Sequence, residues 1–162
     1  MAVYATRLGL VEVADSQRWS CSLPLAGFEE LREFVLMHVP AQGPFLWLQS
    51  LEVPELAFVL CDAACFGLRY AAGAEYEPEH LLAPPCVLVM LPGRAGETLR
   101  VHRQAPVLFD VHAGTLRQQV FEPEHIHGDG AWVGPGACAA VNPAWAERII
   151  SVQPLQSAGE GA

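Results

Sequence analysis

The sequence predicts a mainly β protein, a small closed or partly closed β-barrel of about eight to ten short strands with one or two short helices. Short segments that are apolar or that alternate in polarity recur at close spacing from residue 18 to residue 121, with turn residues between them. Such spacing is typical of a barrel or sandwich. Hydrophobic residues make up 52% of the 162 residues and charged residues 17%, so we expect a folded chain with a real core.

The strands of the first half differ in their polarity pattern. Trp19, Cys21 and Leu23 alternate with polar residues, which is the period of a half-buried strand. Residues 45–48 and 56–61 are instead apolar at every position, and each segment follows a proline-bearing turn. This second pattern predicts strands that are buried on both faces.

Four further strands are predicted in the second half, at residues 86–91, 98–103, 107–111 and 116–121. The first of them ends at a turn formed by Pro92 and Gly93. Ala113 and Gly114 stand where a hairpin turn would join the last two strands.

Helical signal is confined to two short segments. Phe28, Leu31 and Phe34 have the spacing of one helix face and predict a helix of two turns at residues 28–34. Asn142 followed by Pro143 is an N-cap followed by proline at the first helical position, which predicts a second short helix.

Two short strings of the sequence resemble each other. Residues 76–81 and 121–126 both read aromatic, Glu, Pro, Glu, His, aliphatic. Each predicts a strand end that turns into one helical turn with proline at its first position. Two copies are too few for a repeat architecture.

The charge balance narrows the possible partners. The net charge is −9, and all nine basic residues are arginine. We therefore expect no direct nucleic-acid binding, which needs clustered basic residues. The lack of lysine excludes Schiff-base chemistry and a P-loop. A basic protein partner suits the negative charge, although solubility alone accounts for it equally well.

Cellular location is predicted from what the sequence lacks. The first residues do not have the pattern of a signal peptide, and no apolar run approaches the ~20 residues of a membrane helix. The five cysteines are unevenly spaced and odd in number, which predicts free, mostly buried thiols in a reducing compartment. We expect a cytoplasmic monomer that does not bind membranes.

Reactive chemistry finds little support in the motifs. The cysteine and histidine spacings, with Cys61, Cys65, His125, His127 and Cys138, are looser than those of zinc sites. The sequence has no G-x-S-x-G, no H-E-x-x-H and no glycine-rich phosphate loop. We predict no enzyme activity, no metal and no cofactor. A metal-dependent enzyme that uses His125, His127 and a nearby Cys or Glu stays open as an alternative.

A third interpretation is a protein-binding surface. Glutamates recur in clusters, several of them beside an aromatic residue such as Phe28, Tyr76 or Phe121. Aromatic anchors with a charged rim are typical of protein interfaces. The same pattern arises when aromatic residues form the core and charges solvate the surface.

Several ordered segments resemble the FliW family of flagellar assembly factors. The most specific is 43–50, Gly-Pro-Phe-Leu-Trp-Leu-Gln-Ser, and the others are 6–13, 27–31, 54–59, 76–79, 105–108 and 119–120. The resemblance implies a compact β-barrel without enzyme activity. It implies further that the protein binds CsrA, a small basic RNA-binding translational repressor, and flagellin in competition, and so relieves repression of flagellin synthesis.

On this hypothesis an acidic, partly aromatic face meets the partner. The residues that we expect to contact it are Tyr70, Tyr76, Glu77, Glu79, Pro106 and Val107. The chain departs from the family pattern at residues 24–28, has extra residues around 68–75, and has no recognisable counterpart at 125–162. We therefore expect a barrel domain at 1–124 and an extension at 125–162 that packs on it, with a frayed tail from about 153. Such an extension could also redirect a FliW-like scaffold to another partner.

Overall fold

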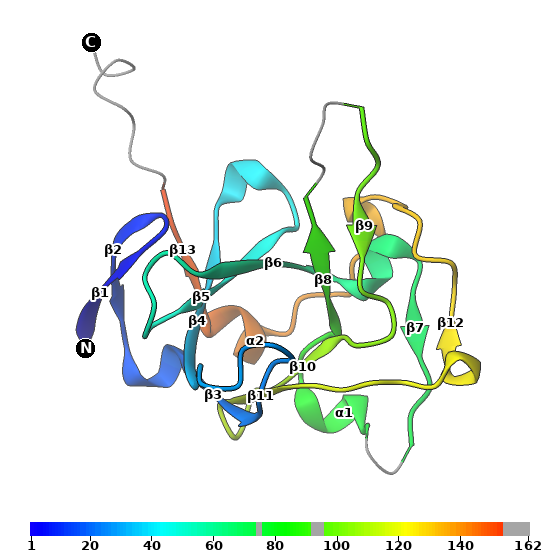
Figure 1. Cartoon of the computed structure of the whole chain (residues 1–162), viewed down its shortest axis with the longest axis horizontal. Helices are drawn as coiled ribbons and strands as arrows, with labels where there is room; N and C mark the ends of the chain where they lie inside the picture. The colour runs from blue at the N-terminus through cyan, green and yellow to red at the C-terminus, as the bar shows by residue number, and fades with distance from the viewer. Residues whose placement is uncertain (74–75, 92–95, 154–162) are drawn as a thin grey trace.

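The computed structural model describes residues 1–73, 76–91 and 96–153 of the chain, and Figure 1 shows mostly short strands. The first half of the chain holds β1 (Ala2–Thr6), β2 (Gly9–Val13), β3 (Arg18–Leu23), β4 (Glu33–His38), β5 (Leu46–Ser50), β6 (Ala57–Asp62) and β7 (Arg69–Tyr70). The second half holds α1 (Pro78–Leu81), β8 (Cys86–Met90), β9 (Arg100–Val101), β10 (Val107–Asp110), β11 (Thr115–Gln118), β12 (Ile126–His127), α2 (Pro143–Glu147) and β13 (Ile149–Ser151).

Seven of the described strands close into a barrel. Their order around the ring is β3-β4-β5-β6-β8-β10-β11. The ring closes because β11 pairs in parallel with β3, and because Val107 of β10 lies opposite Cys86 of β8. The predicted fold class, a mainly β protein with a small closed barrel and one or two short helices, is confirmed.

The apolar strands owe their pattern to layers on both faces of the barrel wall. On β4, Phe34 and Leu36 point into the barrel interior, while Val35 and Met37 pack outward against the hairpin of β1 and β2. Successive side chains of a strand point to opposite faces, so a strand between two apolar layers is apolar throughout. The strands predicted to be buried on both faces, now β5 and β6, lie in this wall.

A second core lies outside the barrel, at the end of the molecule that holds β7 and β12. It joins outward residues of β6, β8 and β10 to the chain at 63–70 and 121–126; its members include Cys65, Phe66, Leu68, Tyr70, Tyr76 and Phe121. β7 and β12 pair with each other, Tyr70 opposite Ile126. This small sheet positions the region in which the partner-contacting residues were predicted.

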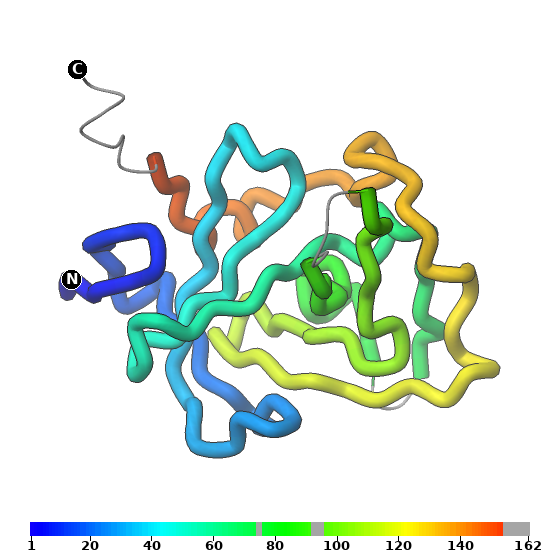
Figure 2. The backbone as a smooth tube through the Cα atoms, turned by 45° about the horizontal axis from the view of Figure 1, so that its top comes forward, coloured from blue at the N-terminus to red at the C-terminus, as the bar shows by residue number. Residues whose placement is uncertain are grey.

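The chain beyond residue 128 returns across the barrel, and Figure 2 shows it running from the β7–β12 end back toward β4. Asn142 caps α2 by accepting a hydrogen bond from the Ala144 amide, as the sequence predicts. Trp145 of α2 packs in the barrel core, and β13 then pairs in parallel with β4. The boundary at residue 124 stays a prediction.

The helix predicted at residues 28–34 is wrong. Phe28 and Leu31 lie in turns, and Phe34 belongs to β4, where it pairs with Trp19 of β3. The helical spacing of these apolar residues is coincidental, because strand pairing with β3 places Phe34 in the core and overrides local propensity. α1 and α2, the α-helices among the described residues, are four and five residues long, too short to span a membrane.

Two of the predicted strands are shorter in the structure. Of residues 98–103 only Arg100–Val101 is a strand, and the last predicted strand ends at Gln118. Gly114, at a φ of 68°, forms the predicted turn between β10 and β11. The predicted turn at Pro92 and Gly93 and the predicted tail after Gln153 lie outside the described residues.

Candidate functional site

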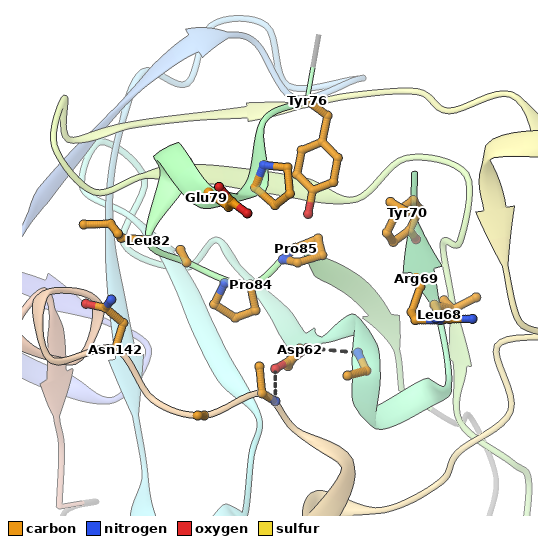
Figure 3. A pocket seen from close by; sticks show the side chains of 15 residues that line it. Asp62, Leu68, Arg69, Tyr70, Tyr76, Glu79, Leu82, Pro84, Pro85 and Asn142 are labelled. Carbon is orange, nitrogen blue, oxygen red and sulfur yellow. Dashed lines mark hydrogen bonds between the residues drawn. The ribbon is translucent and has the colours of Figure 1, made fainter. Parts of the chain in front are cut away.

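A hollow of about 510 Å³ opens beside the β7–β12 end of the barrel, and Figure 3 shows its lining. Three stretches of chain contribute: residues 62–70 from the end of β6 to β7, residues 76–85 around α1, and residues 139–142. Most of the lining is apolar, with prolines and alanines between the aromatic rings. Its charged members are Asp62, Arg69 and Glu79. A hollow of this shape can receive an apolar side chain of a partner and pair with a few polar groups at its edge.

Two tyrosine rings line the hollow, and the Phe121 ring contacts both of them. Tyr70 and Tyr76 both pack on Phe121, with ring centroids 4.8 Å and 5.5 Å apart. The Tyr70 hydroxyl donates a hydrogen bond of 2.5 Å to the Arg103 carbonyl. Only 8% of Tyr70 and 4% of Tyr76 is exposed, so these rings shape the hollow more than they project from it.

The two similar strings of the sequence meet at this aromatic cluster. Tyr76 begins the first string and Phe121 begins the second, and their rings contact edge to face. Pro78 is the first residue of α1 and Pro123 is the first residue of a 3-10 turn, so the predicted turns with proline at the first position are confirmed. After each aromatic residue, the polar residues of the string are exposed.

α1 carries the acidic rim. Glu79 lines the hollow, whereas Glu77 lies 3.2 Å from the His80 ring, Oε2 to Nε2. Both glutamates are exposed. Leu82 ends α1 in a left-handed conformation, at a φ of 59°, and its side chain turns back toward the barrel core.

Asp62 links two of the stretches of chain that line the hollow. Its carboxylate accepts hydrogen bonds from the amides of Ala64 and Ala139, each at 2.9 Å, and Figure 3 shows both. The first bond caps the 3-10 turn at Ala63–Phe66, and the second ties the chain at residue 139 to the barrel. Sequence reasoning did not single out Asp62, because an aspartate at a strand end is an ordinary capping residue.

The predicted contact residues divide into two groups. The structure brings Tyr70, Tyr76 and Glu79 together around the hollow and leaves Glu77 on the adjoining surface. Pro106 and Val107 do not line it, and Val107 is fully buried in the barrel core.

The cysteines differ from prediction. Cys65 and Cys138 form a disulfide, with Cα atoms 5.2 Å apart, so the prediction that all five thiols are free is wrong for this pair. Uneven spacing in the sequence does not report the proximity of residues that are 73 positions apart. Cys21, Cys61 and Cys86 are free. Burial raises the pKa of the Cys21 thiol to about 11 and that of Cys61 to about 12, and it also raises the pKa of Cys86.

The residues of the alternative metal site are dispersed. His125 and His127 are both exposed, and Cys138 is bonded to Cys65. Among the residues described by the structure, no three His, Cys, Asp or Glu side chains form a group that could hold a metal ion.

Alkaline titration tests the burial of the two tyrosines. Burial raises the pKa of Tyr76 from its ordinary value of 10.0 to about 12, and it raises the pKa of Tyr70 as well. Between pH 10 and 12 the unfolded chain loses these protons while the folded chain keeps them, so the free energy of unfolding falls as pH rises. Urea unfolding from pH 8 to pH 11.5 should show this decline, and Tyr76→Phe should lessen it. An unchanged slope in the variant would contradict the burial of Tyr76.

Comparison with known proteins places this architecture in a family. The family model described as "FliW protein" matches residues 2–128, most of the chain. The chain belongs to the FliW family. The sequence resemblance is thereby confirmed. Related proteins of this family carry the name flagellar assembly factor FliW.

Individual relatives extend over most of the barrel. The flagellar assembly factor FliW of Bdellovibrio bacteriovorus is 29% identical over 133 residues, which are 78% of this chain and 75% of that protein. FliW of Thermotoga maritima is 28% identical over 130 residues, 75% of this chain and 87% of its own. A shorter match to FliW of Syntrophotalea carbinolica reaches 45% identity over 65 residues, 40% of this chain and 46% of that protein.

A solved structure shares the fold. The chain superimposes on the crystal structure of a flagellar assembly factor FliW with a TM-score of 0.62, at 23% identity. The superposition covers 75% of this chain and 90% of the other. At this sequence identity the superposition supports a shared barrel fold, and it assigns no role to the residues that line the hollow.

Proposed function

We propose that this FliW-family chain binds CsrA and flagellin in alternation, and that binding of CsrA relieves repression of flagellin synthesis. The observation that carries the proposal is the hollow lined by Tyr70, Tyr76 and Glu79, which lies on a barrel of the flagellar assembly factor family. A partner switch of this kind needs one surface that two proteins can occupy in turn.

The exposed glutamates of the two similar strings favour a basic partner. Both aromatic-led strings leave their glutamates exposed: Glu77, Glu79, Glu122 and Glu124. With a net charge of −9 and no lysine, the chain attracts a basic protein such as CsrA and steers its approach. The buried rings beside the acidic rim supply the rigid apolar surface on which interface affinity usually depends.

Calorimetry of the purified chain with CsrA from the same organism tests the proposal. We expect a saturable heat and co-elution of the two proteins in gel filtration, with a Kd below about 1 μM, as a specific regulator requires. If the two proteins give no heat and do not co-elute at roughly tens of micromolar, that result counts decisively against CsrA as a partner.

Charge reversal at the rim tests the place of binding. Replacing Glu79 by arginine should weaken CsrA binding at least about tenfold, because it puts a positive group at the edge of the hollow. Glu12→Arg is the matched control, since Glu12 is exposed on β2, in the hairpin at the other end of the molecule (Figure 1). Equal losses in the two variants would show that total charge, and not this surface, governs the affinity.

A further inference from the structure

The chain at residues 135–141, here named the strap, forms a wall shared by two hollows. Ala139 and Ala140 line the hollow beside Tyr76, and they also line a second hollow of about 410 Å³ next to Trp145. Asp62 and Pro84 belong to both linings as well. The strap therefore divides a longer apolar groove into two parts. It lies beyond residues 2–128, the part of the chain that the family model matches.

The two ends of the strap are held independently of the disulfide. Before it, the amides of Val133 and Gly134 both donate to the Cys65 carbonyl. After it, Asn142 caps α2, and Trp145 is buried in the barrel core. The flanking chain is therefore held on the barrel by contacts that do not involve the disulfide bond itself.

The strap between these anchors is weakly held apart from its covalent bond. Ala139, Ala140 and Val141 are exposed, with 72% of Val141 accessible to solvent, so the strap buries little apolar area at these positions. Among the residues that the structure describes, one hydrogen bond, from the Ala139 amide to Asp62, ties residues 139–141 to the barrel, and the disulfide from Cys138 to Cys65 holds the chain just before them. Opening free energies are small where buried contacts are few.

We propose that the disulfide is a redox latch and that the strap is the lid that it holds over the groove. Reduction by a dithiol breaks the bond between Cys65 and Cys138 in two exchange steps. A thiolate of the reductant attacks Sγ of Cys138, which is the more accessible of the two, and Cys65 leaves as a thiolate that takes up a proton. The second thiol of the reductant then displaces Cys138, which is protonated in turn, and the reductant is left as a disulfide.

The other thiols do not compete in this reaction. Burial raises the pKa values of Cys21, Cys61 and Cys86 above the ordinary value for a thiol, and thiols react as thiolates. Release of the strap joins the two hollows into one longer groove that a partner can enter. Resting on the proposed function, this predicts that the reduced protein binds its partner more tightly than the oxidised protein.

Hydrogen exchange of the whole chain tests the latch directly. Peptides that cover the strap should exchange about tenfold faster after treatment with dithiothreitol, whereas peptides from β4 and β5 should not change. Cys138→Ser without reductant should match the reduced protein, and Cys21→Ser should keep the response of the parent chain. Equal exchange in the oxidised and reduced protein would overturn the latch.

Binding of CsrA to the two forms tests the lid. We expect at least about a threefold lower Kd for the reduced protein and for Cys138→Ser than for the oxidised protein. Equal affinities would overturn the control of the groove by the strap. Failure of all three forms to bind CsrA would count against the proposed function, and the exchange experiment would still decide whether the latch exists.

Discussion

Replacing Trp19 by alanine is expected to lower the free energy of unfolding by about 3–5 kcal/mol. Trp19 is fully buried and stands at the meeting point of the barrel and the chain that returns across it. Its ring centroid lies 5.0 Å from that of Phe109 on β10 and 5.9 Å from that of Trp145 on α2. The Arg148 guanidinium lies over the ring, 4.8 Å from its centroid. Truncation removes all of these contacts and leaves a large cavity.

Urea unfolding followed by circular dichroism measures this loss. Trp132→Ala is the matched control, because 42% of Trp132 is exposed and its ring packs on Phe45 and Phe66 outside the barrel. Its loss should cost less than half as much. Trp19→Phe should also cost less than alanine, since the Trp19 indole nitrogen has no hydrogen-bond partner among the described residues. A loss of stability below about 1 kcal/mol in Trp19→Ala would contradict the placement of this ring in the core.

The second large effect is expected at Gln49. Its replacement by leucine should lower the free energy of unfolding by about 3 kcal/mol. Gln49 is fully buried in β5. Its Oε1 accepts a hydrogen bond of 3.0 Å from the Arg7 amide in the turn of the β1–β2 hairpin, and its Nε2 donates to the Pro54 carbonyl at 2.9 Å. Leucine has a similar volume but cannot make these partly buried hydrogen bonds to the Arg7 amide and the Pro54 carbonyl, and a polar group that loses its partner costs more than the bond contributes.

Thermal unfolding of Gln49→Leu checks this expectation, with Gln104→Leu as control at an exposed position. The control should stay within about 0.5 kcal/mol of the parent chain. A stable Gln49→Leu that lost CsrA binding would assign this residue to the interface and contradict a structural role.

The Trp-Leu-Gln-Ser block was the most specific sign of the family, and the structure explains it by folding. Leu48 fills the barrel core, and the Ser50 hydroxyl accepts hydrogen bonds from the amides of Glu52 and Val53, which fixes the turn after β5. Family membership was thus predictable from residues that hold the scaffold. The proposed partner surface was less predictable, because its residues are placed by contacts between distant segments.

Local signals succeeded where tertiary contacts agree with them. The cap at Asn142 and the prolines that begin α1 and α2 depend on backbone geometry within one turn, so the sequence alone predicts them. The helix expected at 28–34 failed because Phe34 pairs with Trp19, and no local pattern reports that pairing. The strands β7, β12 and β13 have two or three residues each, too few to show a period.

The same limit applies to the candidate site. Tyr70 and Tyr76 were predicted from the region of the sequence that holds them, and both lie at the hollow. Val107 was predicted alongside them but is fully buried, since a strand with both faces covered does not reveal which of its residues reach the surface. Asp62 and the Cys65–Cys138 disulfide emerge only when the chain beyond residue 128 folds back on the barrel.

The central claim, one surface shared by two partners, is tested most directly by competition. A preformed complex of this chain with fluorescently labelled CsrA is titrated with monomeric flagellin, and the anisotropy of the label is recorded. Release of CsrA as flagellin approaches the concentration of the complex is the predicted result. A complex that never forms, or an anisotropy that stays high because all three proteins bind together, would contradict it.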